Sequence, residues 1–197
     1  MRPPLSDRAL LLLLASVTAL GPIATNLYLP ALPSVRGYFG ASVAEVQATF
    51  SVSLVMFAFG VLAWGPVSDR YGRRAAVLGG LSIMICGALV SVVAPTLHWL
   101  VAGRAMQAFG VATGLVTARA IIADLYPADR MVKTLASLTM VAVVGNSLAP
   151  VLGGFLAAGL GWRAIFATLV VTAISVAFIV WRRLPETRPA TDRPPRG

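Results

Sequence analysis

An arginine and a glutamine inside a long apolar run are the residues best suited to chemistry in this sequence. Counted from Leu97, Arg104 lies about 10 Å along a helix, and Gln107 lies one turn further on the same face. A charged side chain near the centre of a bilayer costs at least ~2.5–3.5 kcal/mol, so it is normally paired or faces water on a substrate or ion path. We therefore expect both residues to line such a path. The structural alternative is an arginine that snorkels to the outer surface.

A further polar residue, Asn26, lies near the middle of the first apolar run. A buried amide in hydrocarbon needs a hydrogen-bond partner. We therefore expect Asn26 to face the interior of the helix bundle or a hydrated cavity rather than lipid.

Several other chemistries lack the residues they need. One cysteine, Cys86, and one histidine, His98, offer neither a disulfide nor a metal site, and no cofactor is expected. An intramembrane serine protease needs a G-x-S-G nucleophile and a histidine base, whereas the nearest string here is Gly145-Asn146-Ser147-Leu148. The net charge of +9 does not indicate nucleic acid, because the basic residues sit at the ends of apolar runs. We therefore predict a protein that is not an enzyme.

Composition predicts an all-α integral membrane protein. The chain has 197 residues, of which 58% are hydrophobic and only 12% are charged. An α-helix needs about 20 apolar residues to cross the hydrocarbon core. Six runs satisfy that length, and we expect a six-helix bundle within residues 1–181, followed by a polar cytoplasmic tail at 182–197. The expected helices cover about 9–33, 44–64, 75–94, 97–125, 131–158 and 162–181.

The distribution of basic residues predicts the orientation. Twelve of the sixteen lie at the N-terminus, after the second and fourth runs and in the tail, whereas the opposite loops hold only Arg36 and Arg163. Positively charged loops face the cytoplasm. Both termini are therefore predicted to be cytoplasmic, which requires an even number of crossings.

A charged turn separates the second and third runs, and we expect it to be a loop at the cytoplasmic surface. The string follows the pattern G-x-x-x-D-R-x-G-R-R, which is met by Gly65, Asp69, Arg70, Gly72, Arg73 and Arg74. It resembles the loop between helices 2 and 3 of the major facilitator superfamily of secondary transporters, in which it acts as a gating turn. The positive-inside rule alone explains the arginines, but not the aspartate or the glycine spacing.

Other strings strengthen this resemblance. Arg104 and Gln107 are similar to the R-x-x-Q-G motif of helix 4 in that superfamily, with Ala108 in place of glycine. The fifth run resembles the antiporter motif G-x-x-x-G-P-x-x-G-G, carried here by Gly145, Ala149, Pro150, Gly153 and Gly154. The strings at 28–33, 161–163 and 184–187 are similar to the Bcr/CflA multidrug branch of the drug:proton antiporters.

The resemblance implies one half of a twelve-helix fold, built as a 3+3 inverted repeat in a bacterial inner membrane. It implies efflux of amphiphilic drugs or metabolites by proton-coupled antiport, together with a second six-helix half from another copy or another chain. The implied cavity lining comprises Asn26, Met56, Phe57, Arg104, Gln107 and Asn146. Arg119 and Asp124 are expected to tie the fourth helix to the charged turn near Asp69 and Arg73.

Two departures from the family pattern leave alternatives open. That branch usually carries an aspartate where Asn26 stands, and an amide does not carry a proton at physiological pH. The chain also stops in what would be the linker between the two halves. A non-transporting fragment of a twelve-helix transporter is therefore the alternative to an exporter.

Overall fold

The computed structural model describes residues 6–187, and residues 188–197 of the predicted tail lie outside this range. Every regular element among the described residues is a helix. The helices are α1 (Asp7–Tyr28), the short 3-10 helix η1 (Leu29–Ala31), α2 (Leu32–Phe39), α3 (Val43–Tyr71), α4 (Arg73–Val92), α5 (Leu97–Leu125), α6 (Ala128–Leu160) and α7 (Trp162–Arg183). Six segments are long and apolar enough to cross a membrane, with α1, η1 and α2 together forming the first. The predicted all-α, six-span architecture is confirmed.

The two largest differences from the predicted boundaries are at the ends of the first and second spans. The first span reaches Phe39 rather than residue 33, because Pro30 and Pro33 occupy first-turn positions of η1 and α2, where a missing amide donor costs little. Helix α3 continues through Pro66 to Tyr71, and only Gly72 separates it from α4. The expected ten-residue surface loop is therefore mostly helix.

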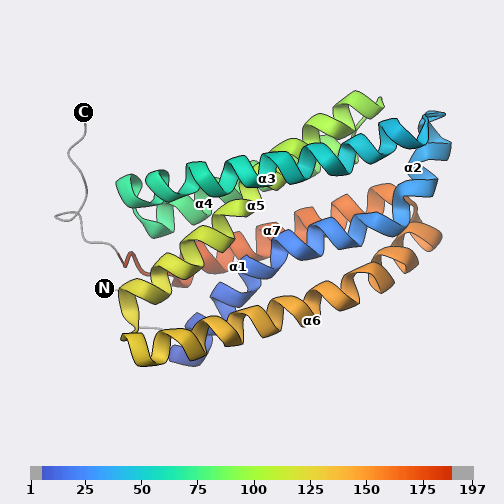
Figure 1. The fold of residues 1–197 in the computed structure, drawn as a ribbon. Coiled ribbons are helices and arrows are strands. Elements are labelled where there is room, and N and C mark those ends of the chain that lie inside the picture. The colour runs from blue at the N-terminus through green and yellow to red at the C-terminus, as the bar shows by residue number, and fades with distance from the viewer. Residues whose placement is uncertain (1–5, 188–197) are drawn as a thin grey trace.

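The spans pack as two groups that lie side by side, one of α3, α4 and α5 and the other of α1, α6 and α7 (Figure 1). Helix α5 makes its main contacts with α4 and α3, whereas α1 packs mainly against α6, and α4 contacts α7. The first three spans are α1, α3 and α4, and the last three are α5, α6 and α7. If each of the first three is exchanged with its counterpart in the last three, the α5–α3 pair becomes the α1–α6 pair. This is the relation that an inverted repeat of three helices requires.

Glycines bring α4 and α5 into direct backbone contact. A Cβ added at Gly87 would lie 2.5 Å from the amide nitrogen of Gln107, and one added at Gly110 would lie 2.5 Å from the carbonyl oxygen of Gly80. Small residues allow this close approach between membrane helices. The contact fixes the rotation of α5 and therefore the direction in which Arg104 points.

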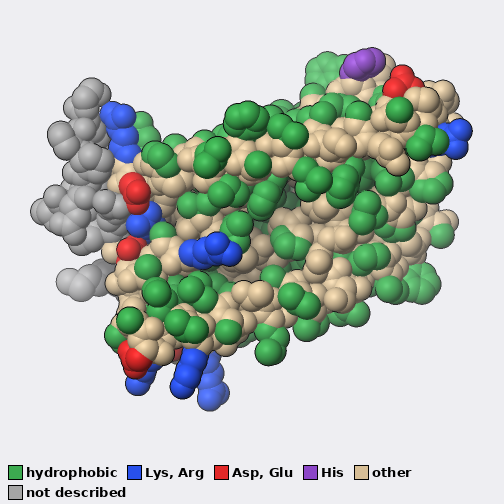
Figure 2. Space-filling model, in the orientation of Figure 1, with side chains coloured by type: hydrophobic (Ala, Val, Ile, Leu, Met, Phe, Trp, Pro, Cys, Tyr) green, Lys and Arg blue, Asp and Glu red, His purple; other side chains and the backbone are tan. Residues whose placement is uncertain are grey.

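Charge and apolar surface are separated along the bundle (Figure 2). Basic side chains gather at the end where α3 meets α4 and where α6 begins, which we call the basic end, while apolar side chains cover much of the length between the two ends. Helices α3 and α6 are the least buried spans. Much of their apolar surface is therefore uncovered.

We predict that Gly87→Ala destabilises the bundle, because its methyl group would overlap the backbone of α5. A cost of about 1–3 kcal/mol, seen as a lower unfolding temperature in detergent, is the expected size of such overpacking. Gly79→Ala is the matched control, since its Cβ would lie 3.6 Å from the nearest atom, on Trp64. Equal unfolding temperatures for the two variants would contradict the packing described above.

Candidate functional site

The polar centre of the bundle is a buried pair on α5. Arg104 is 2% exposed and Gln107 is 1% exposed. The Nη1 of Arg104 donates to Oε1 of Gln107 at 2.9 Å and to the carbonyl oxygen of Ala24 at 3.4 Å. The guanidinium also lies over the ring of Tyr28, with its Cζ 4.6 Å from the ring centroid. Arg104 therefore points into the bundle, which excludes the snorkelling alternative.

The pair has more donors than the protein satisfies. Nε and Nη2 of Arg104 and Nε2 of Gln107 have no hydrogen-bond partner among the described residues. Leaving a buried donor unsatisfied costs about 1–3 kcal/mol, and more when the group is charged. These three nitrogens are therefore poised to hold a group that accepts hydrogen bonds.

A cavity of about 200 Å³ is lined by Arg104 and Gln107 among other residues, and we call it the central cavity. It lies between α1, α3, α5 and α6. It is lined by five of the predicted site residues, which are Asn26, Phe57, Arg104, Gln107 and Asn146. The lining residues that the sequence did not indicate include Pro22, Thr25, Ser53 and Leu54.

Two asparagines close the central cavity on the side of α1 and α6. The amide nitrogen of Asn26 donates to the side-chain oxygen of Asn146 and, at 3.0 Å, to the carbonyl oxygen of Pro22. The Pro22 carbonyl lies one turn before Asn26 on α1, so the second contact is within the same helix. Asn26 thus faces the interior of the bundle, and its amide is satisfied by protein partners.

A second cavity of about 360 Å³ lies closer to the basic end, and we call it the inner cavity. Arg119, Thr18 and Thr139 give it polar lining, and most of the remainder is apolar. The placement of Arg119 here is a correction, because we expected it to bind the charged turn. Met56, expected beside Phe57, lines neither the central nor the inner cavity.

A larger cavity of about 720 Å³ opens at the end opposite the basic end. Tyr38, Glu45 and His98 are among its lining residues, and none of the predicted site residues takes part. The central cavity remains the candidate site, because three of the five buried side-chain atoms without a partner among the described residues belong to Arg104 and Gln107, which line it.

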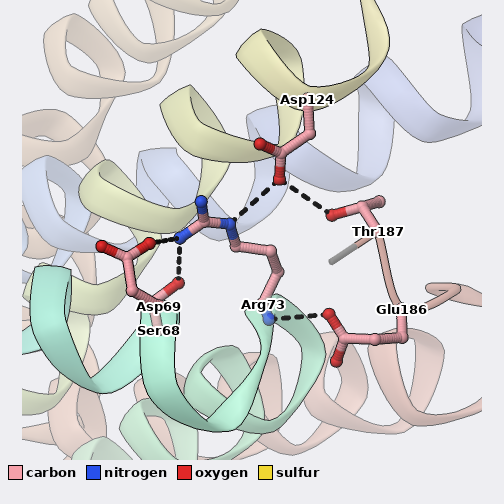
Figure 3. A network of polar contacts seen from close by, with 6 residues as sticks. All are labelled: Ser68, Asp69, Arg73, Asp124, Glu186 and Thr187. Atoms are coloured by element: carbon pink, nitrogen blue, oxygen red, sulfur yellow. Dashed lines mark hydrogen bonds and ion pairs between the residues drawn. The ribbon is translucent and has the colours of Figure 1, made fainter. Parts of the chain in front are cut away.

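At the basic end, Arg73 joins several elements (Figure 3). Its side chain is 8% exposed, and it pairs with Asp69 at 2.7 Å and with Asp124 at 3.0 Å. Nη1 also donates to the hydroxyl oxygen of Ser68 at 2.9 Å. Asp124 thus contacts the turn between α3 and α4, whereas Arg119 does not.

The segment after α7 completes this network. The backbone amide of Arg73 donates to Glu186 at 2.8 Å, and the hydroxyl of Thr187 donates to Asp124 at 3.3 Å (Figure 3). Gly72, with φ of 98°, supplies the sharp turn that exposes this amide. The sequence signal was the string at 184–187, but nothing in it indicated the partners.

The small residues of α6 face α1. Ala149 is 1% exposed, and a Cβ added at Gly153 would overlap the carbonyl group of Leu27. One added at Gly145 would lie 3.2 Å from Ile23. Together with Pro150 and Gly154, these residues bring α6 against α1 beside the Asn26–Asn146 contact.

Comparison with known proteins identifies relatives of this arrangement. A sequence model described as the Major Facilitator Superfamily matches residues 14–197. Multidrug resistance protein D of Escherichia coli K12 is 36% identical over 180 residues, which cover 91% of this chain and 46% of that protein. The chloramphenicol resistance protein of Pseudomonas aeruginosa is 34% identical, over 91% of this chain and 43% of its own length.

Solved structures share the fold. The crystal structure of a bacterial homologue of the human lysosomal transporter Spinster matches 95% of this chain and 45% of its own, with a TM-score of 0.75 and 22% identity. That of a D-xylose-proton symporter gives a TM-score of 0.76 at 18% identity, over 90% of this chain and 48% of its own. The chain therefore spans about half the length of the proteins it matches.

We predict that Asp124→Asn loosens the basic end, because Arg73 and Thr187 would lose a charged acceptor. The expected loss is about 1–2 kcal/mol of the free energy of unfolding, since the pair is partly exposed. Asp129→Asn, an exposed acid in the first turn of α6, is the matched control. Unfolding in detergent measures both, and an equal effect of the two changes would contradict the assigned contacts.

Proposed function

The chain belongs to the major facilitator superfamily, and from that premise we propose that it is one half of an efflux transporter for drugs or small metabolites. It is a multi-pass membrane protein, and the bacterial origin of its relatives supports a place in a bacterial inner membrane. The names of those relatives, which record resistance to multiple drugs and to chloramphenicol, support export rather than uptake.

One observation carries this proposal: Arg104 is buried within α5 and lines the central cavity. Two of its nitrogens have no hydrogen-bond partner among the described residues. A cation at this depth is unfavourable unless it is hydrated or paired. A cavity that admits water and cargo in turn relieves that cost. Alternating access, in which two halves rock around a fixed central site, gives the arginine this role.

A second six-helix half is part of the proposal. Helices α3 and α6 flank the central cavity and are the least buried spans, so an opposing half would cover the polar lining that lipid solvates poorly. The length of the relatives, about twice that of this chain, supports such a partner. A second copy of the chain or a separate chain would supply it.

Proton-coupled antiport needs an acid that the central cavity does not have. The described acids, Asp7, Glu45, Asp69, Asp124, Asp129 and Glu186, lie at helix ends or beyond them, and none lines the central or inner cavity. We propose that the opposing half contributes the proton carrier. The antiporter-like segment of α6 supports exchange, because it brings α6 against α1 beside the central cavity.

The network around Arg73 has a mechanical role in this scheme. It links α3, α4, the end of α5 and the segment after α7, so these elements would move together at the basic end. We propose that this network stabilises one of the two conformations of the transporter. Rocking of the two halves would then change how far the network is exposed to water.

We predict that Arg104→Ala strongly reduces efflux. Losing a charged hydrogen-bond donor costs about 1.5–3 kcal/mol, so chloramphenicol efflux from expressing cells should fall by about tenfold or more. Arg36→Ala, a change at an exposed arginine at the opposite end, should leave efflux unchanged. Chloramphenicol accumulation at matched expression measures both, and equal accumulation in all strains would contradict transport.

We also predict that cross-linking in native membranes recovers the chain in a complex with a second six-helix half. A complex containing only this chain would identify a homodimer, and one containing a different chain would identify a split transporter. Recovery of monomers alone would favour a non-transporting fragment.

A further inference from the structure

The central and inner cavities follow one face of the bundle. Both are lined by Gly21 and Pro22 of α1, Phe57 of α3 and Val111 of α5. The two cavities therefore adjoin, and together they follow α5 from the middle of the bundle toward the basic end.

Two arginines mark this path. Arg104, which is buried, lines the central cavity, and Arg119, which is exposed, lines the inner one; both come from α5. Fifteen residues separate them along the sequence, which corresponds to about 22 Å along the helix axis. None of the acidic side chains that the structure describes lines either cavity. The wall that this half contributes is therefore positively charged, with no countercharge of its own.

The hydrogen-bonding groups of the central cavity also favour a negatively charged cargo, because the unpartnered ones are donors. Arg104 and Gln107 leave three buried nitrogens unpartnered, while the side-chain oxygen of Gln107 already accepts from Arg104 and that of Asn146 accepts from Asn26. If these side chains turn toward the cavity that they line, a cargo group placed there meets free donors. That chemistry suits an oxygen that carries negative charge, because charge-assisted hydrogen bonds are the strong ones.

The rest of the path is apolar. Phe57 and Val111 line both cavities, and Leu115, Leu135 and Leu138 line the inner one. Such walls favour the hydrocarbon or aromatic part of a cargo, whereas the arginines favour its charged group. A cationic amphiphile would find the same apolar surface but would be repelled by like charge.

We propose that this half selects amphipathic organic anions. A carboxylate, sulfonate or phosphate would be held by Arg104 in the central cavity and by Arg119 in the inner cavity, with the apolar part against Phe57 and Val111. The inference rests on the proposed efflux function and specifies its cargo. It assigns Arg119, whose position in an export path the sequence did not indicate, to cargo binding.

The test compares three probes that share one fluorophore: dansylglycine as the anion, dansylamide as the neutral probe and dansylcholine as the cation. Each is titrated against the full chain in nanodiscs, with empty nanodiscs as the blank. We expect dansylglycine to bind more tightly than dansylcholine. Arg119→Gln should weaken dansylglycine binding by about tenfold and leave dansylamide binding unchanged, because only the anion uses the charge.

Two further variants separate charge from structure. Arg119→Lys keeps the charge and should bind dansylglycine nearly as well as the original chain, whereas Arg130→Gln removes an exposed charge outside both cavities and should have no effect. Stronger binding of dansylcholine, or an equal loss of all three probes in Arg119→Gln, would overturn the proposal. If Arg119→Gln does not fold, the order of the three probes and the Lys variant still decide it.

Probe binding in nanodiscs and efflux from expressing cells together separate this inference from the proposed function. Arg104-dependent export of chloramphenicol without dansylglycine binding would overturn the cargo class and leave efflux standing. Binding of dansylglycine without any export would support the anion site and contradict efflux.

Discussion

A guanidinium buried within a membrane-spanning helix is the constraint on which the rest of this structure depends. Arg104 is held by Gln107, by the carbonyl of Ala24 and by the ring of Tyr28, and these contacts leave two of its nitrogens without a partner among the described residues. Water or an acceptor group must therefore reach it. The glycine contacts between α4 and α5 and the asparagine contact between α1 and α6 set the walls of the cavity where this happens.

Two buried arginines, Arg73 and Arg104, differ in whether their charge is compensated by carboxylates. Arg73 meets two carboxylates, the hydroxyl of Ser68 and an additional carboxylate at its backbone amide, so its charge is compensated within the chain. Arg104 meets no carboxylate from residues 6–187. The first arrangement suits a contact that fastens elements together at the basic end. The second suits a site whose missing partner arrives from outside the chain.

Sequence patterns predicted the features that depend on local composition. Six spans follow from apolar runs. The burial of Arg104 and Gln107 and the inward placement of the half-buried Asn26 follow from the cost of polar groups in hydrocarbon. The continuation of α3 to Tyr71 was missed, because charged residues at a membrane surface are equally compatible with loop and helix. The carboxylate of Glu186 at the start of α4 and the position of Arg119 in the inner cavity depend on packing between distant helices. No local pattern encodes such contacts.

The central claim is that a hydrated path borders Arg104, and water access at one matched pair of positions on α3 tests it most directly. Leu54 and Val55 are neighbours with 51% and 54% exposure, but only Leu54 lines the central cavity. Each is replaced by cysteine in a Cys86→Ser background and treated in membranes with a thiol reagent that does not cross the bilayer. A hydrated path beside Arg104 predicts labelling at position 54 and none at 55. Equal protection at both positions would place Arg104 in a dry bundle and contradict the account.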